Sequence, residues 1–154
     1  MEEHSITENL EMKLNESAKD FLKETAKWAY FLSILGYVGI GFIVLAGLFA
    51  GTLFSAMGKM NPAMSSMGSS FGIIMAVVYL LIAALYFFPV YYLNKFASNA
   101  KIACATNDSD KLTVSFQYLK SHYKFIGIMT IVIFSLYFLM IIIAFIGGAA
   151  MGSM

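Results

Sequence analysis

Three long apolar runs without charge divide this chain, and polar segments separate them. The runs cover residues 28–54, 71–93 and 125–146, and none of them contains Asp, Glu, Lys, Arg or His. Each is longer than the roughly 20 apolar residues that cross a bilayer as a helix. In hydrocarbon an isolated span must satisfy its own backbone hydrogen bonds, and a helix does so. The pattern therefore predicts an all-α fold with three transmembrane helices.

Helical spacing continues beyond the second and third runs. Residues 94–105 extend the second helix past its apolar part, and the third helix begins before its own apolar run. The apolar positions of this early part are Leu112, Phe116, Leu119 and Tyr123. The two extensions form a helical hairpin, residues 94–124, outside the bilayer.

The N-terminal segment predicts a further, amphipathic helix. Ser5 and Glu8 have the spacing of a capping box, and apolar residues recur behind them at helical spacing. They are Ile6, Leu10, Leu14, Phe21 and Leu22. This stripe suits a membrane surface or a partner, but its mixed charge favours packing on the hairpin as a small three-helix extension. We therefore divide the chain into an amphipathic helix, residues 1–27, and a three-span membrane domain, residues 28–154.

The lysines predict which way the chain crosses the membrane. With three spans, the N-terminal helix and the hairpin lie on the same side, and every lysine except Lys59 falls there. Positively charged segments stay in the cytoplasm. The sequence therefore predicts a cytoplasmic N-terminus, a C-terminus outside the cytoplasm, and second and third helices that extend into the cytoplasm.

The composition excludes several classes of protein. Apolar residues make up 60% of the chain and charged residues 12%, against about 45–50% and about 25% in soluble domains. The net charge of +1 argues against nucleic acid as a partner, because phosphate binding requires a basic surface. The single cysteine, Cys104, forms no intrachain disulfide or CxxC pair. The starting segment MEEHSITENLEMK lacks an apolar core, so we expect no secretory signal peptide in it.

The short segment CATNDSDK, residues 104–111, combines a thiol with two carboxylates. A calcium loop would require an oxygen ligand and then a glycine where Leu112 and Thr113 stand, so the pattern does not fit. Asp108 suits the N-cap of the third helix, and Asp110 suits its first turn because of the helix dipole. We expect a turn here rather than a metal site.

Titratable groups are missing from the spans. The only histidines are His4 and His122, and we expect a satisfied or solvent-facing ring for His122. General acid–base catalysis requires titratable groups in a shielded site, and intramembrane carboxylates mark ion-coupled transport. We therefore predict a non-enzymatic protein with no catalytic residues and no cofactor.

Small residues in the first span offer helix-packing surfaces. We expect Gly36, Gly39, Gly47 and Gly51 to pack against another helix, since glycine lets backbones approach closely in lipid. Gly47 and Gly51 form a GxxxG motif, which serves contacts within one chain or between two chains. Three spans bury little surface on their own, and this favours a homo-oligomer or a complex with another membrane protein.

Pro89 interrupts the second span near its lysine-rich side. Proline has no N–H and cannot bond to the carbonyl one turn earlier, so it kinks a helix. We expect a static kink at Pro89 in preference to a moving hinge.

Methionines recur at helical spacing on the outer side, at Met57, Met60, Met64 and Met67. Thioethers bind Cu(I), but no histidine or cysteine lies on that side to complete a site. Methionine also serves as a flexible apolar filler. We therefore expect no metal site there and keep copper handling as an alternative.

Three segments resemble a known family. They are ILGYVGIGFIVLAGLFAG, LYFFPVYYLNKFASNAKIA and FQYLKSHYKFIGI, within residues 27–146. Together they resemble a family of small bacterial inner-membrane proteins known only as a domain of unknown function. The resemblance implies a multi-pass protein of the bacterial inner membrane and carries over no functional residues.

The leading interpretation is a non-enzymatic scaffold or accessory subunit that lies in the lipid bilayer and self-associates or binds a membrane partner. The alternative is an oligomeric pore or transport component. Its polar lining would come from Ser33, Thr52, Thr130 and Ser135.

Overall fold

The computed structural model describes residues 15–60 and 68–152. These residues form three helices: α2 (Glu16–Met60), α4 (Gly68–Thr106) and α5 (Ser109–Gly152). No strand occurs in the described part. Each helix contains a stretch long and apolar enough to cross a membrane, so the predicted all-α fold with three such helices is confirmed.

The first helix does not stop where the first apolar run begins. α2 continues without a break from Glu16 through the lysine-bearing segment into the apolar run. The amphipathic segment and the first span are therefore one helix in the described residues. The predicted capping box at Ser5 and Glu8 lies outside those residues. Asn15 caps α2, since its Oδ1 accepts a hydrogen bond from the Ala18 N–H at 2.8 Å.

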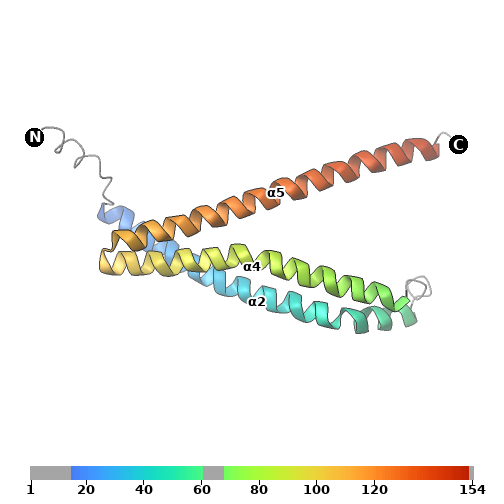
Figure 1. Cartoon of the computed structure of the whole chain (residues 1–154), viewed down its shortest axis with the longest axis horizontal. Coiled ribbons are helices and arrows are strands. Elements are labelled where there is room, and N and C mark those ends of the chain that lie inside the picture. Colours follow the sequence, from blue (N-terminus) through green and yellow to red (C-terminus); the bar gives the residue numbers. More distant parts are fainter. Residues whose placement is uncertain (1–14, 61–67, 153–154) are drawn as a thin grey trace, which may run out of the picture.

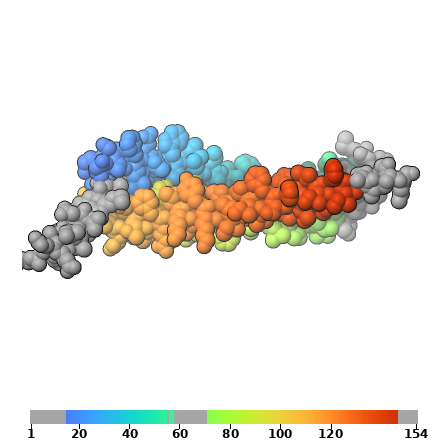
Figure 2. Space-filling model, turned by 90° about the horizontal axis from the view of Figure 1, so that it is seen from above, coloured from blue at the N-terminus to red at the C-terminus, as the bar shows by residue number. Residues whose placement is uncertain are grey.

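The three helices are arranged as a long pair and a third helix that leaves it (Figure 1). α2 and α4 run antiparallel and side by side. α5 starts beside the end of α4 and then diverges from the pair. In the view from above, α5 lies over the other two helices (Figure 2). We call the end that holds the start of α2, the end of α4 and the start of α5 the lysine-rich end, and the opposite end the far end.

A seam of small and medium side chains joins α2 to α4. Its positions on α2 alternate steps of three and four residues, which is the spacing of a coiled coil, and all are buried or half-buried. They are Ala26, Ala29, Ser33, Gly36, Ile40, Ile43, Gly47 and Ala50. Small residues at this spacing let two backbones approach closely along the whole pair.

The backbones of α2 and α4 approach each other most closely toward the far end of the seam. A Cβ atom on Gly72 would lie 2.8 Å from the Cα of Gly51. Phe54 and Phe71 then pack edge to face with ring centroids 5.0 Å apart. The pair of helices therefore stays in contact up to its far end.

All three helices share a core only at the lysine-rich end. Phe96, Ala97 and Ala100 of α4 are buried there, together with Ala26 and Ala29 of α2. Leu22 of α2 and Leu119 of α5 pack against this cluster from two sides. The small three-helix extension predicted from the sequence is present at this end.

The turn between α4 and α5 ties the lysine-rich end together. Asn107 takes a left-handed conformation with φ 53°, and the Asp108 N–H donates to the Ala103 carbonyl at 3.3 Å, as in a helix-ending Schellman motif. Asp108 then caps α5, because its Oδ1 accepts from the N–H groups of Asp110 and Lys111 at 2.9 and 3.0 Å. Lys19 of α2 donates to Asn107 Oδ1 at 2.8 Å. The segment CATNDSDK is thus a structural turn.

Candidate functional site: the point where α5 leaves the helix pair

A histidine and a proline face each other where α5 separates from α4. Pro89 lies inside α4, and the helix continues on both sides of it. The Nδ1 atom of His122 in α5 lies 2.8 Å from the carbonyl oxygen of Pro89. A carbonyl oxygen only accepts hydrogen bonds, so Nδ1 carries the proton and donates it. The His122 ring is half-buried at this contact.

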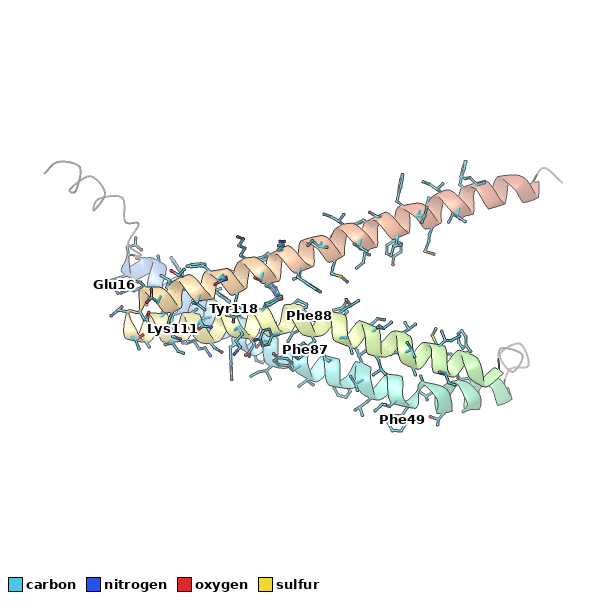
Figure 3. All side chains as sticks on the ribbon, viewed as in Figure 1. Glu16, Phe49, Phe87, Phe88, Lys111 and Tyr118 are labelled. Carbon is cyan, nitrogen blue, oxygen red and sulfur yellow. The ribbon has the colours of Figure 1, made fainter. Side chains whose placement is uncertain are left out.

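Aromatic pairs flank this hydrogen bond on both sides. Toward the far end, Phe88 and Phe125 pack with ring centroids 5.8 Å apart. Toward the lysine-rich end, Tyr92 and Tyr118 pack at 6.5 Å. Figure 3 labels Phe88 on α4 and Tyr118 on α5 where the two ribbons begin to separate. We call these six residues the junction: Phe88, Pro89, Tyr92, Tyr118, His122 and Phe125.

Beyond the junction, α5 makes a span that the rest of the described chain does not cover. Every residue from Thr130 to Ile146 is exposed, including Phe145 at 80% and Phe134 at 71%. No residue of the most apolar window of α5 is buried. We call residues 130–146 the free span. Its side chains stand away from the ribbon on all sides (Figure 3).

A polar contact fixes α2 against α4 near the same level. Asn94 Nδ2 donates to Ser33 Oγ at 2.9 Å, and Ser33 Oγ donates to the Tyr30 carbonyl at 2.7 Å. Ser33 is completely buried. The Lys101 ammonium also lies 3.9 Å from the centre of the Tyr30 ring, a cation–π contact between the two helices. These contacts fix the register of the α2–α4 pair.

The predicted helix-packing glycines divide between two sides of α2. A Cβ on Gly36 would lie 2.7 Å from Val90 Cγ2, and a Cβ on Gly47 would lie 3.0 Å from Tyr79 Cβ. Gly51 touches Gly72 of α4 through its own Cα, but a Cβ on Gly51 would meet nothing within 4 Å. Within the GxxxG motif, only Gly47 therefore has its side-chain position covered by α4. Gly39 has open space around its Cα and lies outside the seam.

The polar residues predicted to line a pore lie on separate surfaces. Ser33 is enclosed between α2 and α4. The Thr52 hydroxyl donates to the Phe49 carbonyl of its own helix at 2.8 Å, and the Ser135 hydroxyl likewise donates to Ile131 at 2.8 Å. Thr130 and Ser135 both belong to the free span. Within one chain these four residues do not form a common lining.

The described residues give little support to a metal site. Met57 is exposed on α2, and Met60 is the last residue of that helix. Met64 and Met67 lie outside the described residues. Across residues 15–60 and 68–152, no three His, Cys, Asp or Glu side chains come together in a group that could hold a metal ion. Cys104 is half-buried beside the backbone of Lys19.

The bond between His122 and Pro89 was not predicted from the sequence. These residues are 33 positions apart, and their meeting depends on the register that the turn at Asn107 and Asp108 imposes on α4 and α5. One signal in the sequence could have predicted this bond: the imidazole of His122 lies on the extension of α5 at the level of Pro89, the only proline of α4.

No protein-family model, curated protein or solved structure matches this chain. The class of protein to which it belongs is therefore inferred from its fold and from the contacts of the junction. It is a multi-pass helical membrane protein with a tightly packed pair of helices and a third helix attached at one end.

Proposed function

We propose that this protein is a non-enzymatic scaffold or accessory subunit of a bacterial inner membrane, and that its free span binds a transmembrane helix of a second copy or of another membrane protein. A single contrast carries the proposal. Every residue from Thr130 to Ile146 is exposed, whereas α2 and α4 bury a seam along their whole contact. One span of three is thus left for a contact outside the chain.

The sequence of α5 supports a helix as the partner of this span. Lipid tails are as apolar as leucine, so helix association in a bilayer depends on small residues and polar side chains instead of on hydrophobicity. Ala144, near the end of the free span, is followed at four-residue spacing by Gly148 and Gly152, which lie beyond the free span in α5. This is the small-xxx-small pattern on which a second backbone approaches closely.

Photo-cross-linking of single-cysteine variants labelled with a benzophenone maleimide in native membranes tests this proposal. Cys104→Ser removes the native thiol, and cysteines are then placed one at a time along the free span. We expect cross-linked species at positions that recur about every 3.6 residues, since one helix face meets the partner. Gly148→Leu should abolish them. Gly39→Leu is the matched control, because Gly39 has open space around it, and it should retain them. Absence of any cross-linked species along the span would refute the proposal.

The proposed orientation places the lysine-rich end in the cytoplasm. Lys59 lies in the last turn of α2, whereas the other lysines of the described residues belong to the lysine-rich end. This asymmetry supports the orientation through the positive-inside rule. Single cysteines at Met57 and Lys111 test it in the Cys104→Ser background. An impermeant maleimide should label Met57→Cys in intact cells and Lys111→Cys only after permeabilisation. The reverse pattern would contradict the orientation.

A further inference from the structure

The His122–Pro89 contact is the one hydrogen bond between α4 and α5 among the described side chains outside their connecting turn. Beyond it, Phe125 and Met129 are the last half-buried side chains of α5 before the free span, whose residues are all exposed. The bond therefore lies just before the free span, at the place where the direction of that span is determined.

The bond requires a proton on Nδ1, because the Pro89 carbonyl only accepts hydrogen bonds. Pro89 has no N–H and leaves the carbonyl of Leu85 without its usual partner in α4. The bond thus joins α5 to α4 in the same region where α4 lacks one of its own backbone bonds.

The neighbouring aromatic contacts cannot provide the same constraint. Offset and tilted ring pairs are favourable over a range of separations and angles, so Phe88–Phe125 and Tyr92–Tyr118 tolerate sliding. A hydrogen bond prefers a donor angle above about 150° and weakens steeply below about 120°. Among the junction contacts, the His122 bond is therefore the one that restricts the angle between the two helices.

We propose that His122 is a positioning residue that sets the direction in which the free span leaves α4. Only the consequence of this positioning rests on the proposed function: a free span that is held in one direction presents one of its faces to the partner helix. Leu136 lies about 21 Å along α5 from His122, so a swing of about 15° displaces it by about 5 Å. A displacement of this size is measurable between two spin labels.

The test uses the full chain in single-copy nanodiscs, with Cys104→Ser and two pairs of spin-labelled cysteines. A far pair at Leu81 and Leu136 reports the free span, since both residues are exposed beyond the junction. A near pair at Ile102 and Phe116 reports the lysine-rich end. His122→Phe keeps an aromatic ring and removes the donor, whereas His122→Gln restores an N–H donor. Tyr123→Phe, at a neighbouring exposed residue, is the matched control.

We expect a narrow far-pair distance distribution in the parent protein and in Tyr123→Phe. His122→Phe should broaden it or shift it by about 5 Å or more, and His122→Gln should narrow it again. The near pair should stay unchanged in all variants. An unaltered far-pair distribution in His122→Phe would overturn the proposal. So would a change of the near pair, since His122 would then hold the whole contact. The proposed function fails separately, by absence of cross-linking in native membranes.

Discussion

The α2–α4 pair and the free span of α5 have similar apolar composition but opposite packing. α2 meets α4 through residues such as Ser33, Gly36 and Gly47, which recur in steps of three and four. The free span carries mostly large side chains, with Thr130, Ser135 and Ala144 as its small ones, and is exposed throughout. Apolarity therefore places a helix in a membrane, whereas small residues at regular spacing determine which helix it packs against.

The largest effect is expected from filling the close approach at the far end of the pair. In Gly72→Val the new Cβ would lie 2.8 Å from the Cα of Gly51, so the two backbones must move apart. Overpacking of this kind costs about 1–3 kcal/mol. Unfolding by SDS titration should show a destabilisation in that range.

Gly41→Ala is the control for this prediction. Gly41 has open space around its Cα, and alanine favours a helix over glycine by about 1 kcal/mol. This variant should be neutral or stabilising in the same titration. Equal destabilisation by both substitutions would show that the seam is not what joins α2 to α4.

A smaller loss is expected from removing the polar contact within the pair. Asn94→Ala deletes the donor to Ser33 Oγ, while Ser33 still donates to the Tyr30 carbonyl. Interhelical hydrogen bonds in membranes contribute about 0.6–2 kcal/mol, and the unfolding free energy should fall by that amount. Asn99→Ala is the matched variant, because Asn99 donates to Lys95 of its own helix. A larger effect at Asn99 would contradict this assignment.

The attachment of α5 can be weakened through its cap. Asp108→Ala removes the acceptor for the N–H groups of Asp110 and Lys111, which costs about 1 kcal/mol at a helix N-cap. Hydrogen exchange should rise in the first turn of α5 and leave the far end of the α2–α4 pair unchanged. Asp110→Asn removes only a charge near the helix dipole and should have the smaller effect. If exchange instead rose along the whole pair, the two regions would be coupled.

The smallest effect is expected in the free span itself. Leu136 is 56% exposed, so Leu136→Ala should change the stability of a single copy by no more than about 0.5 kcal/mol. Gly36→Leu is the comparison within the seam, where Val90 leaves no room for a side chain. SDS titration of both variants should separate them clearly. A large loss from Leu136→Ala in single copies would show that the span packs against its own chain.

The sequence predicted the helices more completely than their contacts. Long uncharged runs required three spans, and the capping preference of aspartate placed the start of α5 at Asp108. Of the four predicted packing glycines, Gly36 and Gly47 have their side-chain positions covered by α4. The partner was left open by the sequence, because GxxxG serves contacts within and between chains equally well. Gly39 lies outside the seam because it is out of step with the three-and-four spacing of Gly36 and Gly47.

Other features depended on geometry that the sequence does not contain. The bond between His122 and Pro89 requires a particular register between α4 and α5, and a turn of two residues determines that register. The separation of the free span has no local signal either, since its residues are as apolar as those of a packed span. Only the absence of small residues between Thr130 and Phe138, apart from Ser135, distinguishes this part of α5 from α2.

α5 joins its own chain at the lysine-rich end and the junction, and we propose that its free span binds another helix. An oxygen-accessibility scan of spin labels along residues 130–146 tests this arrangement. We expect high accessibility at every position in single-copy nanodiscs, and protection of one helix face in native membranes. Protection of one face already in the single copy, or full accessibility in native membranes, would contradict it.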